Sequence, residues 1–185
     1  MKFLFTPSSQ FNLANMFTFV NIAAGLLAVY YITQNNFFFA VLLAWIGGAF
    51  DIFDGKIARK FNLSNEFGIQ LDSFADFLSF VLVPVFLVFQ AIYSQAELGT
   101  WILLAAIISI YYVIAGLRRL IYFNINTDAG EIENYFSGVP TPLGAILLWL
   151  VYLGATYQYI NVYAVMVLMT LIGISLNSKI KVKHL

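Results

Sequence analysis

Two apolar runs flank a polar turn in the stretch FFFAVLLAWIGGAFDIFDGKIARKFNLSNEFGIQLDSFAD, residues 37–76. The first run is Phe37–Ala58, and the second begins at Ile69 and continues to Tyr93. A helix needs about 20 apolar residues to cross the roughly 30 Å hydrocarbon core of a bilayer. Each run is long enough to do so. The stretch therefore predicts an antiparallel hairpin of two membrane helices.

The composition extends this prediction to the whole chain. Of its 185 residues, 62% are apolar and 10% are charged, whereas soluble domains average about 45–50% apolar and about 25% charged residues. This composition excludes a soluble globule, a disordered chain and a coiled coil. Six apolar runs are evident, Leu13–Thr33, Phe37–Ala58, Ile69–Tyr93, Trp101–Phe123, Leu143–Tyr157 and Ile160–Leu176. We therefore predict an all-α, polytopic bundle of about six transmembrane helices, forming a single domain over residues 1–185 in the cell membrane.

The nine basic residues predict the orientation of this bundle. They fall before the first run, between the second and third, near the end of the fourth and after the sixth: Lys2, Lys56, Arg59, Lys60, Arg118, Arg119, Lys179, Lys181 and Lys183. The other three connections carry no Lys or Arg. Because basic loops stay on the cytoplasmic side of a membrane, we expect both termini in the cytoplasm. The Phe-rich start, residues 1–11, predicts a short segment lying on that membrane surface.

Four aspartates carry most of the chemical information: Asp51, Asp54, Asp72 and Asp76. A carboxylate at the bilayer centre costs about 2.5–3.5 kcal/mol, so these side chains are expected to face protein or water. Helical geometry places the first two about 60° apart around one helix and the last two about 40° apart around the next. A hairpin would therefore turn all four toward one another. Two divalent cations, Mg²⁺ or Mn²⁺, are the natural counter-charge for clustered carboxylates.

Other features near the aspartates bear on what this cluster does. Gly55, Ala58 and Gly68 leave space in which a nucleotide can approach the backbone. The aspartates have two alternative interpretations besides a metal site. They could serve only in structural pairing or helix capping, or they could line a cation or proton path through a transporter. Because the other runs have no acidic residue in their interior, the cluster favours a site open to cytosolic substrates. A net charge of zero gives no reason to expect a nucleic-acid partner.

Residues 51–76 resemble the signature of the CDP-alcohol phosphotransferase family, D-x-x-D-G-x-x-A-R, eight residues, then G-x-x-x-D-x-x-x-D. All eight fixed positions are present: Asp51, Asp54, Gly55, Ala58, Arg59, Gly68, Asp72 and Asp76. The resemblance implies a membrane-embedded homodimer that transfers a substituted phosphate from a CDP-linked donor, usually CDP-diacylglycerol, to an alcohol and releases CMP. It also implies that the four aspartates bind two divalent cations and that Asp76 acts as the general base.

The same resemblance implies which residues contact the CDP-linked donor. In the first apolar run, Thr18 and Asn21 lie one turn apart on one helix face, where the family places a Thr and an Asn close to the donor diphosphate. The other implied donor contacts are Gly55, Ala58, Arg59, Gly68 and Asp72. Arg59 has two roles open to it, holding the hairpin together or contacting a phosphate. The residues are equally compatible with one direct displacement and with two displacements through a covalent intermediate.

Further stretches resemble the membrane-embedded phosphatidylserine synthases within that family. LDSFADFLSFVLVP at 71–84, GLRRLIYFN at 116–124 and YFSGVPTP at 135–142 are similar to runs of that subgroup, with Tyr122 in place of an Arg. The resemblance implies L-serine as acceptor. It places around that acceptor Arg118, Arg119, Asn124, Gly138 and Pro140. Glycerol 3-phosphate and inositol phosphate are the alternative acceptors, and a divalent-cation transporter is the alternative outside the family.

Overall fold

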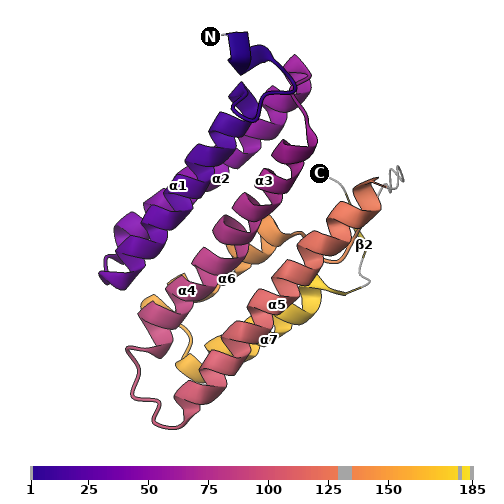
Figure 1. Cartoon of the computed structure of the whole chain (residues 1–185). Coiled ribbons are helices and arrows are strands. Elements are labelled where there is room, and N and C mark those ends of the chain that lie inside the picture. The colour runs from indigo at the N-terminus through magenta and orange to yellow at the C-terminus, as the bar shows by residue number, and fades with distance from the viewer. Residues whose placement is uncertain (1, 129–134, 179–180, 184–185) are drawn as a thin grey trace. The chain divides into compact units, whose positions relative to one another are not determined.

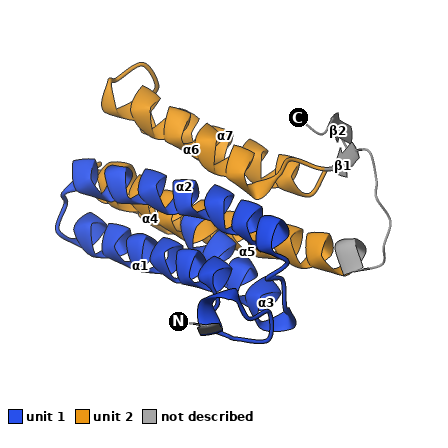
Figure 2. Cartoon of the chain, turned by 90° about the horizontal axis from the view of Figure 1, so that it is seen from above, with its two compact units in different colours: residues 1–79 blue, residues 80–185 orange. Residues whose placement is uncertain are grey.

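The computed structural model describes residues 2–128, 135–178 and 181–183, and Figure 1 shows the succession of its helices. Within these residues the secondary structure is helical apart from two strands of three residues each, and turns join the elements. The helices divide into two compact units, residues 1–79 and residues 80–185 (Figure 2). The expected single domain over residues 1–185 stays a prediction.

Three asparagines begin the helices of the first unit, which are α1 (Leu13–Thr33), α2 (Phe37–Phe61) and α3 (Glu66–Asp76). The side chains of Asn12, Asn36 and Asn65 each accept a hydrogen bond from the backbone N–H three residues further on. Such a cap satisfies one of the unpaired N–H groups at the start of a helix. Asn62, with φ of 51°, ends α2 in the left-handed conformation and starts the turn into α3.

Glycine lets α1 and α2 approach each other closely. The two helices run antiparallel and side by side in both views (Figures 1 and 2). A Cβ atom added at Gly47 on α2 would lie 2.8 Å from Oδ1 of Asn21 on α1. A residue with a side chain at position 47 would therefore push the helices apart. Small residues serve the same purpose in many membrane helix pairs.

The first residues of the chain are tied to the turn between α2 and α3. They include a short 3₁₀ turn, η1 (Lys2–Phe5), whose Phe5 ring meets the Phe61 ring edge-on at 5.6 Å. Asn65 donates from Nδ2 to the carbonyl oxygens of Pro7, at 2.6 Å, and Ser9, at 3.2 Å. The segment is therefore held beside the start of α3. Its expected place on the membrane surface stays a prediction.

The hairpin's second helix is continuous from Glu66 to Tyr93, a length of 28 residues. After α3 it passes through a π-helical stretch, η2 (Phe77–Leu82), then α4 (Val83–Val88) and a second π-helical stretch, η3 (Phe89–Tyr93). Pro84 lies in the first turn of α4 and has no backbone N–H to donate. The two π-helical stretches, whose turns are wider, thus flank the short α-helical segment that contains Pro84.

The remaining helices belong to the second unit and are α5 (Trp101–Asp128), α6 (Thr141–Thr156) and α7 (Val162–Leu176). A hydrogen bond joins the hydroxyl of Tyr93 to the sulfur of Met169 at 3.7 Å, within this unit. The short strands β1 (Tyr135–Ser137) and β2 (Lys181–Lys183) pair antiparallel. The sequence analysis did not predict them, because three residues are too few for a recognisable alternation.

All six expected apolar helices are present, and their ends lie within five residues of the predicted ones. Four of them are long and apolar enough to cross a membrane: Leu13–Thr33, Phe37–Phe61, Glu66–Tyr93 and Trp101–Ile125. The other two, α6 and α7, have 16 and 15 residues, which is short of the usual span of about 20. By length and composition the chain is an integral helical membrane protein. The cytoplasmic location of its termini stays a prediction, and Lys179 lies outside the described residues.

Candidate functional site

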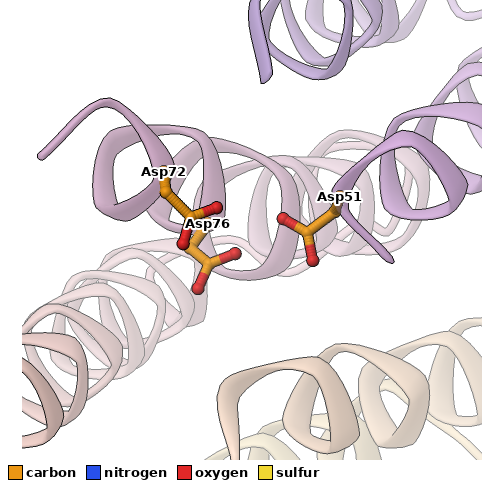
Figure 3. Close-up of side chains that lie close together, drawn as sticks. All are labelled: Asp51, Asp72 and Asp76. Atoms are coloured by element: carbon orange, nitrogen blue, oxygen red, sulfur yellow. The ribbon is translucent and has the colours of Figure 1, made fainter. Parts of the chain in front are cut away.

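Three aspartates from two helices meet in the first unit, as the predicted hairpin requires. Asp51 comes from α2, and Asp72 and Asp76 come from α3, one helical turn apart. Each offers a carboxylate oxygen, and these oxygens all lie within 4.8 Å of one another. Figure 3 shows the three side chains reaching into the same space between the two helices. We call these residues the carboxylate cluster.

The fourth aspartate of the signature is held by a partner of its own. Asp54 is buried, and its Oδ2 accepts a hydrogen bond of 2.7 Å from the hydroxyl of Thr18 on α1. It lies outside the group of three. Both Asp54 and Asp72 line the cavity described below, so the cavity joins the fourth aspartate to the cluster.

Helix α1 contributes hydrogen-bond donors to these carboxylates. Thr18 reaches Asp54, and one turn further on Asn21 donates from Nδ2 to Oδ1 of Asp51 at 3.2 Å. The sequence analysis placed Thr18 and Asn21 on one face, near a donor diphosphate. The structure places their side chains against the aspartates themselves. Hydrogen bonds to a charged acceptor are worth more than neutral ones, about 1.5–3 kcal/mol each.

Ser79 is a polar residue that the sequence analysis did not include among the site residues. It is buried in the first unit, and its hydroxyl donates to Oδ1 of Asn21 at 2.6 Å. The available signal was its position three residues after Asp76, on the continuation of the same helix.

A cavity of about 180 Å³ adjoins the aspartates in the first unit. Its walls come from α1, the end of α2, the turn and the start of α3. They comprise Ala14, Asn15, Thr18, Asp54, Gly55, Ala58, Arg59, Leu63, Ser64, Asn65, Gly68, Ile69 and Asp72. The expected donor contacts therefore surround one cavity, with the exception of Asn21, which contacts the cluster.

The two signature glycines differ in what surrounds them. A Cβ atom added at Gly55 would have only ordinary contacts, 3.6 Å from Nη1 of Arg59, so the space beside Gly55 belongs to the cavity. A Cβ atom added at Gly68 would lie 2.6 Å from Oδ1 of Asn15 and 3.2 Å from Oδ1 of Asn65. Gly68 is therefore required by the packing of this protein, whatever else the cavity holds.

The chemistry of the donor set fits a divalent cation. Three carboxylates this close repel one another strongly unless a positive charge lies between them. They are hard oxygen ligands, which is the type that Mg²⁺ and Mn²⁺ prefer. Thr18 and Asn21 each engage a single carboxylate oxygen, and every carboxylate has a second oxygen for ligation. The carboxylate cluster could hold a metal ion on these grounds.

The expected acceptor residues lie in the second unit. Arg119 is buried and donates from Nε to the carbonyl oxygen of Val139 at 3.3 Å, whereas Arg118 is exposed. Gly138 has a φ of 89°, and a Cβ atom there would lie 2.6 Å from the carbonyl oxygen of Leu176. Arg119 and Gly138 therefore fix the turn before α6 against its surroundings. The part of Asn124 and Pro140 in an acceptor pocket stays a prediction.

Comparison with known proteins finds a family model and curated relatives. The model for CDP-alcohol phosphatidyltransferase matches residues 11–175. A CDP-diacylglycerol–serine O-phosphatidyltransferase of Bacillus subtilis is 35% identical over 144 residues, which are 77% of this chain and 75% of that protein. One from Methanocaldococcus jannaschii is 34% identical over 179 residues, 96% of this chain and 77% of that protein. One from Helicobacter pylori is 31% identical, over 80% of this chain and 60% of that protein.

Proposed function

This chain belongs to the CDP-alcohol phosphatidyltransferase family, and we propose that it transfers the phosphatidyl group of CDP-diacylglycerol to L-serine, forming phosphatidylserine and CMP. One observation carries the proposal. The signature aspartates converge, with three carboxylates within 4.8 Å, in a chain similar to serine phosphatidyltransferases over most of its length. We infer that the chain is an enzyme of phospholipid biosynthesis whose active site faces the cytoplasm.

We assign the metal ligands to the four aspartates. Asp51, Asp72 and Asp76 would hold one divalent cation, and Asp54 with Asp72 would hold a second, as Mg²⁺ or Mn²⁺. When bound, such ions neutralise the charge of a diphosphate and of the carboxylates around it. The hydrogen bonds from Thr18 and Asn21 would keep Asp54 and Asp51 in place when the cations bind.

The cavity is our proposed site for the cytidine diphosphate part of the donor. Its walls include Asp54, Gly55, Ala58, Gly68 and Asp72. The open space at Gly55 would allow the nucleotide to approach the backbone of α2. Arg59 lines the same cavity, and its guanidinium group suits a phosphate oxygen. This favours the phosphate-binding role for Arg59 over the role of holding the hairpin.

Asp76 is the proposed general base. Its carboxylate would accept the proton of the serine hydroxyl while that oxygen forms a bond to the β-phosphorus of the donor. The bond from this phosphorus to the bridging oxygen breaks, and CMP leaves with that oxygen. Asp76 is suited to this role because it belongs to the carboxylate cluster. The carboxylate of serine requires a cationic partner, for which Arg118 and Arg119 are the candidates.

We further propose that the chain works as one catalytic domain and as a homodimer in the membrane, as the family resemblance implies. The same chemistry with glycerol 3-phosphate or inositol phosphate is the second candidate function. A divalent-cation transporter is the third, because clustered intramembrane carboxylates also occur in ion pathways. These candidates differ in what the purified protein does in detergent, where transport across a membrane is impossible.

The test is a CMP-release assay on the full chain with CDP-diacylglycerol and Mn²⁺. L-serine, glycerol 3-phosphate and inositol phosphate are supplied in separate reactions, and Asp76→Asn serves as the control for the base. We expect CMP release with L-serine and with neither of the other two acceptors, and we expect this release to be lost in Asp76→Asn. Release with another acceptor alone would overturn the serine assignment but keep the chemistry. Absence of release with all three acceptors, from protein that binds Mn²⁺, would favour the transporter.

A further inference from the structure

Two successive hydrogen bonds lead from Ser79 through Asn21 to the carboxylate cluster. The hydroxyl of Ser79 donates to Oδ1 of Asn21 at 2.6 Å, and Nδ2 of Asn21 donates to Oδ1 of Asp51 at 3.2 Å. All three residues belong to the first unit. They come from α1, α2 and the continuation of α3, so this pair of bonds connects every membrane helix of that unit.

The pair of hydrogen bonds is buried in space that only glycine leaves free. Asn21 has 0% of its surface exposed and Ser79 has 4%. A Cβ atom at Gly47 would lie 2.8 Å from Oδ1 of Asn21, and one at Gly25 would lie 3.3 Å from Oγ of Ser79. A buried amide without partners is costly. Here both ends of the Asn21 amide have hydrogen-bond partners. An apolar side chain would fill the same space without needing such partners, so we look for a role for the amide beyond packing.

The chemistry of the three groups imposes one direction on the amide. A carboxylate only accepts hydrogen bonds, so Asp51 must face the NH₂ end of Asn21. The oxygen end then requires a donor, and the hydroxyl of Ser79 supplies it. Without the Ser79 hydroxyl, the buried Oδ1 of Asn21 loses its donor. The amide is then held less firmly, with its NH₂ group toward Asp51.

We propose that Ser79 and Asn21 are positioning residues that orient the Asp51 carboxylate for cation binding by the carboxylate cluster. Asn21 bonds to Oδ1 of Asp51, so its amide does not engage Oδ2. Ser79 acts only through Asn21. The inference rests on the proposed function, because it assumes that the cluster binds a divalent cation. Groups that hydrogen-bond to metal ligands commonly set metal affinity in this way.

Manganese binding to the full chain in detergent is the test, measured by the loss of the free Mn²⁺ electron paramagnetic resonance signal. Asn21→Leu, which removes both polar ends at similar volume, should weaken Mn²⁺ binding about tenfold to a hundredfold. Ser79→Ala, which removes one bond of the pair, should weaken it about threefold to tenfold. Ser109→Ala is the matched control, since that buried hydroxyl donates to the Ala105 carbonyl oxygen of its own helix. It should bind Mn²⁺ as the wild type does.

The double variant tests whether Ser79 acts through Asn21. Ser79→Ala combined with Asn21→Leu should bind Mn²⁺ as weakly as Asn21→Leu alone, because the serine then has nothing to orient. If the double variant binds Mn²⁺ more weakly than Asn21→Leu, by the full factor that Ser79→Ala shows alone, Ser79 does not act through Asn21. Unchanged Mn²⁺ affinity in Ser79→Ala would overturn the whole inference. If Asn21→Leu does not yield folded protein, the comparison of Ser79→Ala with Ser109→Ala still decides. A wild-type chain that binds no Mn²⁺ would overturn the metal assignment of the proposed function together with this inference.

Discussion

Replacing Gly55 with alanine should separate the stability of the fold from the binding of the donor. The added Cβ atom would meet Nη1 of Arg59 at 3.6 Å and Nη2 at 3.9 Å, both ordinary contacts. Gly55 lies inside α2, where alanine is favoured over glycine by about 0.5–1 kcal/mol. The variant is therefore expected to unfold at the wild-type temperature or above it.

Donor binding should respond in the opposite direction. The new methyl group enters a cavity of about 180 Å³ that we assign to the cytidine diphosphate. Overpacking by a methyl group typically costs about 1–3 kcal/mol. That cost corresponds to a rise of about fivefold to 150-fold in the KM for CDP-diacylglycerol. The KM for serine should change much less, because the residues that line this cavity include none of the predicted acceptor residues.

The assay is CMP release at varied CDP-diacylglycerol, with thermal unfolding followed on the same samples. Gly68→Ala is the contrast, because its Cβ atom would lie 2.6 Å from Oδ1 of Asn15 and should lower the unfolding temperature. Gly154→Ala, where the Cβ atom would meet only Ile160 at 3.3 and 3.4 Å, is the control for a helical glycine away from the site. An unchanged KM for CDP-diacylglycerol in Gly55→Ala would refute the assignment of the cavity.

Three further outcomes are expected. Thr18→Val keeps the shape but removes the donor to the buried Asp54, so kcat/KM should fall about tenfold to a hundredfold; an unchanged value in the CMP assay would count against that contact. Arg119→Lys cannot reproduce the Nε hydrogen bond to Val139, so the unfolding temperature should fall, and a wild-type melting curve would contradict the role of this contact. Removing divalent cations with EDTA should abolish CMP release and adding Mn²⁺ should restore it, whereas activity in verified metal-free protein would exclude the metal assignment.

The helices could be predicted from the sequence because their signals are local. Runs of apolar residues of membrane length mark each helix, and in the structure asparagines such as Asn12 and Asn65 cap the helix starts. The sequence was less informative where tertiary contacts decide the outcome. The β1–β2 pair, for example, joins segments far apart in the chain.

The sequence by itself determined that an acidic site would form. The helical spacing of Asp51, Asp72 and Asp76 on two helices joined by a short turn suffices to direct them toward one another. Only the tertiary structure decided how α1 takes part. Its rotation against α2 depends on the close contact at Gly47, and that contact brings Thr18 to Asp54 and Asn21 to Asp51. Such contacts between helices depend on packing across the whole unit, which no spacing within a single helix specifies.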